Sequence, residues 1–166
     1  MAKTDVYTYD MQYYLEFANG EGYDEPIQVT EDKEFTPERD ATEYETSYLC
    51  SKVQRKRVVS VKDTYTFSID AVGPGGIQQK LAAIEDTPNV SARLIRTCAY
   101  DFEKGAAADA TALPAKRTPV TVNMNPMDGA VGELCTFGGT AVQDGEDWEK
   151  GTFNPSTGVF TPTATA

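Results

Sequence analysis

Hydrophobic and polar residues alternate with a period of two along most of this 166-residue chain. Such alternation places every second side chain on one face of a β-strand, so it predicts strands with one buried face. The longest example runs from Val59 to Ala71, and at about 3.3 Å per residue it would span roughly 40 Å, unusually long for a small domain. Its apolar face comprises Val59, Val61, Tyr65, Phe67, Ile69 and Ala71. Its polar face comprises Ser60, Lys62, Thr64, Thr66, Ser68 and Asp70.

The same alternation predicts further strands at residues 7–17, 90–102, 120–124 and 131–142. In the first of these, one face is expected to be buried, and it carries Tyr7, Tyr9, Met11, Tyr13, Leu15 and Phe17. The chain closes on DWEKGTFNPSTGVFTP, residues 147–162, which predicts an aromatic β-hairpin. Asn154-Pro155 favours a turn, and Gly158 can take the positive φ that closes a longer loop.

One segment follows a helical period instead. After the glycine-rich stretch GPGG, Ile77, Leu81 and Ile84 fall at i, i+4 and i+7, and Thr87-Pro88 ends the pattern. We expect a short amphipathic helix at Ile77–Asp86 that covers part of a sheet. Residues 18–45 and 103–115 show neither period and are predicted to be long loops, which in compact domains are usually functional or disordered.

Length and composition indicate one ordinary globular domain spanning residues 1–166, with a long acidic loop at 18–45 and a flexible C-terminal tail at 162–166. No apolar run approaches the ~20 residues that a bilayer span needs, and the N-terminus lacks the hydrophobic region of a secretory signal. Cys50, Cys98 and Cys135 are odd in number and far apart, so they are predicted to be buried free thiols of a reducing compartment.

Charge is distributed very unevenly. Of a net charge of −11, residues 16–45 contribute −9, from eleven acids and two bases. A cluster of bases without acids follows, formed by Lys52, Arg55, Lys56, Arg57 and Lys62. This pattern has two interpretations: a solvated loop beside a solvated strand, or two complementary surfaces of a self-assembling subunit.

A search for catalytic chemistry is largely negative. The chain has no histidine, which excludes histidine bases and imidazole metal ligands. GPGGIQQK, residues 73–80, has Gln78-Gln79 where a phosphate loop needs Gly-Lys. The acids around Gly145 lack the spacing of a calcium loop, and no cofactor or metal is expected. Trp148 suits a core or interface anchor better than a carbohydrate-binding platform.

The long alternating strands, the helix at 77–86 and the closing GTFNPSTGVFTP resemble the major tail tube protein of long-tailed (siphovirus-type) bacteriophages. The resemblance is carried by Tyr48–Val72, Ile77–Asp86 and Gly139–Thr163. It implies a mainly β fold, an antiparallel β-sandwich with one short flanking α-helix, whose strands join into a barrel in a ring oligomer. Hexameric rings would stack into a tail tube through which DNA is ejected.

The resemblance also implies a non-enzymatic virion tail protein that is assembled in the cytoplasm of the bacterial host. Its partners would be copies of itself, a tape measure protein, a tail terminator and a distal tail protein, with DNA as transient cargo and no membrane. The polar face Ser60, Lys62, Thr64, Thr66, Ser68 and Asp70 is the candidate lumen lining. Relatives with an extra immunoglobulin-like domain at the C-terminus differ from this chain, which ends at Ala166.

In this family a long loop and the terminal arms make the contacts between rings, and residues 18–45 are the candidate loop here. We add the hypothesis that this acidic loop docks on the basic stretch 52–62 of a neighbour. The inter-ring candidates are Glu21, Asp24, Glu25, Glu31, Asp32, Glu34, Lys52, Arg55, Lys56 and Arg57. The bases could instead contact DNA, although a conduit that bound phosphates tightly would slow its cargo.

Two other classes of protein remain possible. A monomeric β-sandwich that binds a ligand such as a carbohydrate would present exposed aromatic residues in a cleft. Another virion protein, such as a tail terminator or a head decoration protein, would form single closed rings or trimers. An enzyme is the least supported class. The self-assembly state discriminates among these readings.

Overall fold

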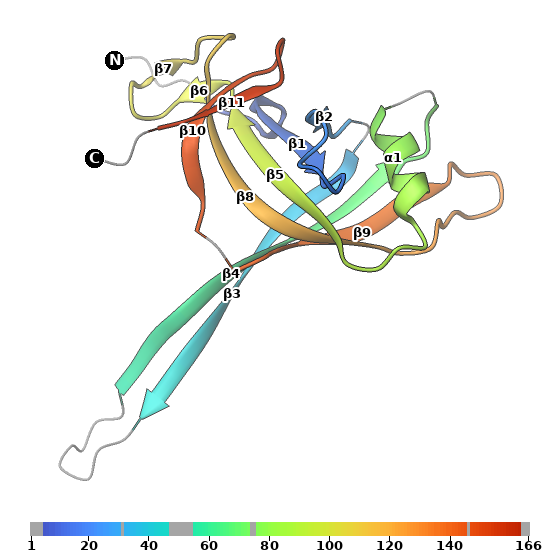
Figure 1. Ribbon diagram of the computed structural model, residues 1–166, viewed down its shortest axis with the longest axis horizontal. Coiled ribbons are helices and arrows are strands. Elements are labelled where there is room, and N and C mark those ends of the chain that lie inside the picture. The colour runs from blue at the N-terminus through green and yellow to red at the C-terminus, as the bar shows by residue number, and fades with distance from the viewer. Residues whose placement is uncertain (1–4, 31, 47–54, 74–75, 146, 164–166) are drawn as a thin grey trace.

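The computed structural model describes residues 5–30, 32–46, 55–73, 76–145 and 147–163 (Figure 1). Its helix is α1 (Gly76–Ile84), and a short 3-10 turn spans Thr8–Asp10. The strands are β1 (Met11–Phe17), β2 (Ile27–Gln28), β3 (Asp32–Thr46), β4 (Arg55–Asp70), β5 (Val90–Cys98), β6 (Tyr100–Asp101), β7 (Ala106–Ala107), β8 (Leu113–Met124), β9 (Thr136–Gln143), β10 (Glu149–Asn154) and β11 (Val159–Pro162). The predicted fold class, mainly β and antiparallel with one short helix, is confirmed.

Nine of these strands form one antiparallel sheet in the order β2-β1-β5-β8-β9-β4-β3, with β10 paired to β8 and β11 paired to β10. The long strand β8 carries two partners along one edge, because its first half pairs with β10 and its second half pairs with β9. The sheet therefore divides at β8 and curves strongly (Figure 1). It forms no closed barrel within the described chain.

The main core lies on one face of this curved sheet. It gathers side chains from β1, β4, β5, β8 and β9 and from α1, which covers one end of the sheet. Ile77, Leu81 and Ile84 are buried, as the helical period predicted. The helix ends at Ile84, two residues before the expected end. On β4 the apolar face is confirmed at Tyr65, Phe67 and Ile69, where burying each side chain contributes about 1.5–3 kcal/mol.

A second, smaller core lies on the other face and consists of Tyr14, Ile95, Ala115, Phe153 and Phe160. The predicted β10–β11 hairpin supplies its two phenylalanines, which pair directly across the strands. Gly158 has the predicted positive φ of 66°. The Tyr14 and Phe153 ring centroids lie 4.6 Å apart. The C-terminal hairpin thus contacts the first strand, 139 positions earlier in the chain by residue number.

This second core corrects the prediction for residues 7–17. Strand β1 buries both faces, since Tyr14 and Glu16 are buried as well as Leu15 and Phe17. Tyr7, Tyr9 and the 3-10 turn lie outside the strand, and both tyrosines are exposed. Alternation at the start of the segment did not indicate burial, because the sheet does not extend to those residues.

The loop predictions were wrong in part. Residues 18–45 include β2 and most of the 15-residue strand β3, and residues 113–115 belong to β8. Strand β3 lacks an apolar period because most of its length has solvent on both faces, so only pairing with β4 makes it a strand. The segment 131–142 becomes a strand only from Thr136.

The predictions for the cysteines and for the C-terminal tail were also right only in part. Cys98 is a buried free thiol, whereas Cys135 is exposed, because it precedes β9 in an exposed turn. Cys50 lies outside the described residues. Pro162 ends β11, and the Thr163 amide donates to the Lys150 carbonyl at 2.8 Å, so the predicted flexible tail does not begin at 162. Residues 164–166 lie outside the described part.

Candidate assembly surface

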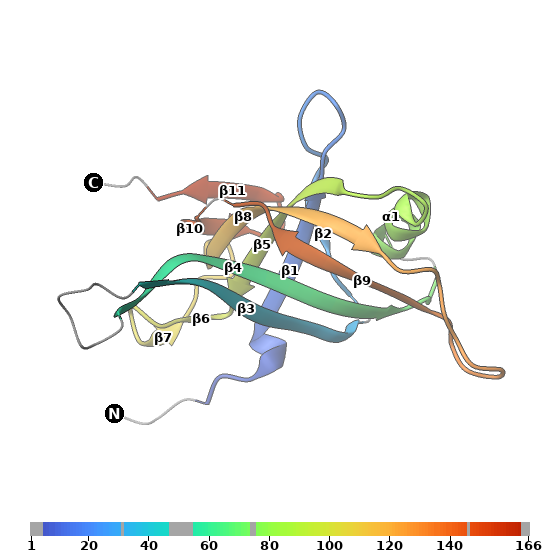
Figure 2. The same ribbon diagram turned by 90° about the horizontal axis from the view of Figure 1, so that it is seen from below.

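Strands β3 and β4 leave the body as a two-stranded arm. Strand β4 pairs with β9 only over Thr64–Asp70, but it pairs with β3 along its whole length. Residues 39–46 and 55–63, which we call the arm, therefore have no strand neighbour on either outer edge within the described chain. Figure 1 shows the arm projecting far from the body. Figure 2 shows that segments 18–26 and 125–135 form two further loops, which leave the body in directions different from that of the arm.

The arm exposes large apolar side chains. Val58, Val59 and Val61 are 51%, 65% and 49% exposed, and Tyr44 on the facing strand is 58% exposed. A register shift between Thr42 and Glu43 leaves Val59 as an extra residue, as in a β-bulge. An isolated two-stranded ribbon is marginally stable in water, so these side chains are well placed to be buried against another surface.

Acids of the segment 18–45 and bases of the stretch 52–62 lie side by side within this one chain. The register places Glu45 opposite Lys56 and Asp40 opposite Lys62. Lys56 Nζ lies 2.6 Å from Glu45 Oε1 and 3.6 Å from Glu43 Oε2. Such exposed pairs contribute little, about 0–1 kcal/mol each. Docking of the acidic segment on a neighbour's basic stretch remains a prediction.

The other inter-ring candidates are spread over the molecule. Glu21, Asp24 and Glu25 lie in the segment between β1 and β2, where Asp24 Oδ2 accepts a hydrogen bond from Lys80 of α1 at 2.7 Å. Asp32 and Glu34 lie at the start of β3, and Arg55 and Arg57 at the start of β4. Glu31 and Lys52 lie outside the described residues.

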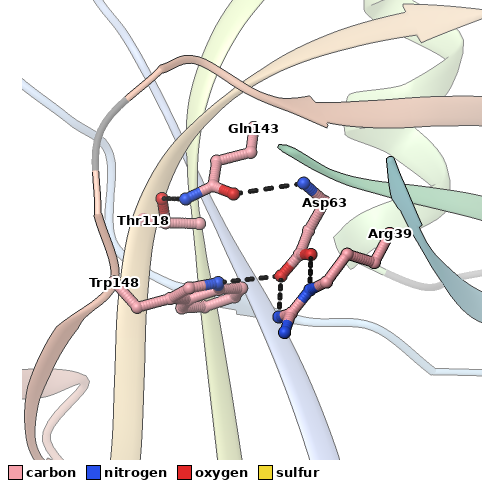
Figure 3. Close-up of polar contacts among 5 residues, drawn as sticks. All are labelled: Arg39, Asp63, Thr118, Gln143 and Trp148. Atoms are coloured by element: carbon pink, nitrogen blue, oxygen red, sulfur yellow. Dashed lines mark hydrogen bonds and ion pairs between the residues drawn. The ribbon is translucent and has the colours of Figure 1, made fainter. Parts of the chain in front are cut away.

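A polar cluster around the buried Asp63 fixes the base of the arm (Figure 3). Arg39 donates to both carboxylate oxygens of Asp63, at 2.6 and 2.9 Å. Trp148 Nε1 donates to Asp63 Oδ2 at 3.0 Å. Gln143 Oε1 accepts from the Asp63 amide at 3.2 Å, and Gln143 Nε2 donates to Thr118 Oγ1 at 3.1 Å.

Electrostatics favour the ionised form of Asp63 in this cluster. The hydrogen bonds from Arg39 hold the pKa of Asp63 below its ordinary value against the opposing effect of burial, and Trp148 and Arg96 act in the same direction as Arg39. The Arg96 guanidinium lies 5.4 Å from the centroid of the Trp148 ring, and that ring meets Tyr65 edge to face. Burial raises the pKa of Tyr65 to about 12. The arm is thus anchored to β8, to β9 and to the loop before β10.

The candidate lumen residues share one face of β4, opposite the core. Thr64, Thr66, Ser68 and Asp70 alternate with the buried residues of β4, and all four are at least partly exposed. Asp70 Oδ1 forms an ion pair with Lys33 Nζ at 2.7 Å. Ser60 and Lys62 continue the same face onto the arm. Whether this face lines a channel stays a prediction.

Sequence reasoning missed Arg39 and Asp63 as the anchor of the arm. They lie 24 positions apart, and Trp148 lies 85 positions from Asp63, so no local spacing signals the cluster. Trp148 itself was predicted to be a core or interface anchor, and it packs half-buried against the main core.

Within the described residues, no three side chains of His, Cys, Asp or Glu converge as metal ligands. The described helix is also too short and too polar to cross a membrane. The features of this surface that remain are exposed apolar residues, unpaired strand edges and opposed charges, all of which suit contacts between proteins.

No protein-family model matches the chain, and no curated protein matches it either. Among solved structures, it is similar to a chain of the anti-feeding prophage baseplate, 6-fold symmetrised, with TM-score 0.47 and 6% identity over 90% of this chain and 97% of that one. It is also similar to a chain of the anti-feeding prophage tube terminating cap, with TM-score 0.47 and 11% identity over 90% of this chain and 94% of that one. Likeness of this degree establishes neither a family nor a function.

Proposed function

We propose that this chain is a structural subunit of a phage tail that self-assembles into hexameric rings, which stack into a tube for DNA ejection. The observation that carries the proposal is the arm, which is anchored at Asp63 yet exposes Val58, Val59, Val61 and Tyr44. The sequence resemblance to tail tube proteins supplies the ring, the tube and the cargo. The proposal includes no catalytic role.

Burial of the arm would bring a clear gain. Fully burying one large apolar side chain contributes about 1.5–3 kcal/mol, so the three valines and the tyrosine offer a substantial part of an interface core. The rigid anchor lowers the entropic cost of association, since the base of the arm is held before binding. The hexameric symmetry of the ring is taken from the resemblance.

Unpaired edges support assembly in the same way. In the arm, both strands have outer edges that pair with no other strand of the described chain. Strands β2, β3 and β11 are edge strands of the sheet. Exposed edges invite pairing with another chain, and closure into a barrel removes them. In the proposed ring, strands of neighbouring copies satisfy these edges.

Negative-stain electron microscopy of the purified protein at high concentration tests the proposal. We expect stacked rings or hollow tubes for the wild type. The double variant Val58→Asp, Val61→Asp is expected to remain monomeric, because two carboxylates would enter the interface. The control Val131→Asp, Leu134→Asp changes two exposed apolar residues outside the arm and is expected to assemble.

The other outcomes identify the competing classes. Single closed rings that never stack would indicate a tail terminator or a head decoration protein. A monomer at every concentration and salt level tested would contradict self-assembly and favour a monomeric ligand-binding module. The tape measure, terminator and distal tail partners follow from the resemblance and are to be tested by co-purification.

A further inference from the structure

Three basic residues lie in one row across three neighbouring strands. The register places Arg96 of β5 opposite Lys116 of β8, and Lys116 opposite Lys150 of β10. Directly opposite residues have Cβ atoms about 4.5–5.5 Å apart, and like charges there are destabilising. We call Arg96, Lys116 and Lys150 the basic row. It is unusual in a chain with 26 acidic and 15 basic residues.

No acid neutralises the two lysines of the row. Neither Lys116 nor Lys150 forms an ion pair with any residue in the described ranges. Burial lowers the pKa of Lys116, and the charges of Arg96, Lys150 and Arg39 lower it further. Arg96 is stacked on Trp148, and its charge acts on Asp63.

The basic row lines a groove of about 500 Å³. Its floor continues through Met11, Cys98, Pro114 and Thr152, and its wall comes from the β6–β7 segment, including Tyr100, Phe102 and Lys104. Two acids, Asp101 and Glu103, also line the groove, but Asp101 is engaged by Lys104 at 3.2 Å and by two backbone amides. The groove is thus concave, open and predominantly basic.

An acidic strip of matching length lies on β3. Glu34 and Glu38 share one face, because the register is regular between Glu34 and Thr42. Their cross-strand neighbours are Ser68 and Thr64, which are uncharged, and neither glutamate has an ion pair in the described chain. Four residues of strand span about 13 Å, and two strand spacings span about 10 Å. The two charge patterns therefore have similar dimensions.

One chain cannot join its own strip to its own groove. Lys116 lies on the core face of the sheet, because it shares one face of β8 with the core residues Val120 and Val122. Glu34 and Glu38 lie on the opposite face of the sheet, because they alternate along β3 with the residues that pair with the core residues of β4. Contact between them must be intermolecular. A contact between two different patches of identical chains is head to tail and generates rings or filaments.

We propose that the basic row Arg96, Lys116 and Lys150 is a docking site for the Glu34–Glu38 strip of a second copy of this chain. This inference rests on the proposed self-assembly and names two surfaces that carry it. It differs from the docking of residues 18–45 on the basic stretch 52–62, because it uses a basic site on β5, β8 and β10. Carboxylates of a neighbour relieve the repulsion that the row carries in the isolated chain.

Two complementary variants test the inference without requiring a tube. The groove variant Lys116→Gln, Lys150→Gln keeps the strip, and the strip variant Glu34→Gln, Glu38→Gln keeps the groove. Each alone is expected to lose head-to-tail association. In their mixture, the intact strip of one variant is expected to bind the intact groove of the other, giving a 1:1 complex of twice the 18.1 kDa of one chain. The complex grows no further, because its other groove and its other strip are neutralised. Analytical ultracentrifugation at about 50 mM and about 1 M salt follows the complex, which should dissociate at high salt.

Matched controls carry the same charge changes elsewhere. Glu133→Gln, Asp144→Asn replaces the strip variant, and Lys80→Gln, Arg117→Gln replaces the groove variant. Both controls are expected to keep the head-to-tail association of the wild type. A mixture of the two test variants that shows no complex at low salt would overturn the inference. Binding of a labelled duplex DNA by the wild type, lost in the groove variant while no complex forms, would assign the row to phosphates instead.

The two proposals can fail separately. Tubes formed by both test variants alone would overturn the docking site while leaving the tail-tube function in place. A wild type that never forms rings, together with a capped complex in the mixture, would support the docking site and contradict the tube.

Discussion

Trp148 Nε1 lies 3.0 Å from Asp63 Oδ2 and donates a hydrogen bond to it, although the two residues are 85 positions apart. The same oxygen accepts a hydrogen bond from Arg39 Nη2 at 2.9 Å. The contact joins the loop before β10 to the point where β4 leaves the body (Figure 3). It holds the base of an arm that otherwise has solvent around it.

Trp148→Phe tests the energetic weight of this contact. The substitution keeps an aromatic ring but removes the donor, and a hydrogen bond to a charged group contributes about 1.5–3 kcal/mol. We expect the free energy of unfolding to fall by about that amount, measured by urea denaturation followed by circular dichroism. Tyr9→Phe, at a side chain that is 74% exposed, is the control and is expected to change nothing. Equal stability of both variants would contradict an anchoring role for Trp148.

Acid should weaken the cluster through Asp63. Since the folded-state pKa of Asp63 is lowered from 3.8, its stabilising contribution is fully present above the unfolded pKa and is lost as pH falls through the folded pKa. We expect the urea midpoint of Asp63→Asn to depend less on pH below about 4 than that of the wild type. Glu133→Gln, at an exposed acid outside the arm, is the control and is expected to keep the pH profile of the wild type. Parallel pH profiles for wild type and Asp63→Asn would contradict the assignment.

Lys116→Gln should stabilise the isolated chain. It removes a charge that stands opposite both Arg96 and Lys150, and relief of such cross-strand repulsion contributes about 0.2–1 kcal/mol. Because the pKa of Lys116 is lowered in the folded state, the penalty is present below the folded pKa and disappears as pH rises toward 10.5. Urea denaturation at neutral and alkaline pH measures both effects. A destabilised Lys116→Gln would show that its charge is compensated within the chain.

Gly139→Ala should destabilise the sheet. An added Cβ would lie 2.6 Å from the Asn123 carbonyl oxygen and 2.8 Å from the Phe67 ring, so the strands must shift. Overpacking of this kind costs about 1–3 kcal/mol. Gly22→Ala, where nothing lies within 4 Å, is the matched control. The difference between the two unfolding free energies checks the packing of β9 between β4 and β8.

Local periodicity was sufficient for several elements. The apolar residues 65, 67 and 69 and the helix residues Ile77, Leu81 and Ile84 are buried as their spacing indicated. The C-terminal hairpin also forms where it was predicted. In each, the side chains that face the core recur at the period of the element itself, so a short stretch of chain contains the whole signal. The turn at Gly158 is local for the same reason.

Other features depend on residues that meet only in the fold. Val59 and Val61 continue the apolar alternation of β4, yet they are exposed, because the body of the sheet ends at Asp63. Alternation gives the direction of a side chain and carries no information on whether another layer covers it. The burial of Tyr14 likewise required the C-terminal hairpin to reach the first strand.

The charged residues show most clearly what the sequence determines and what only the fold determines. The amino-acid sequence alone establishes that residues 16–45 are strongly acidic and that bases follow. Pairing partners are set by strand register, which brought Glu45 to Lys56 and aligned Arg96, Lys116 and Lys150 across three strands. Electrostatic interactions depend on distances through space, and antiparallel pairing of distant segments decides those distances.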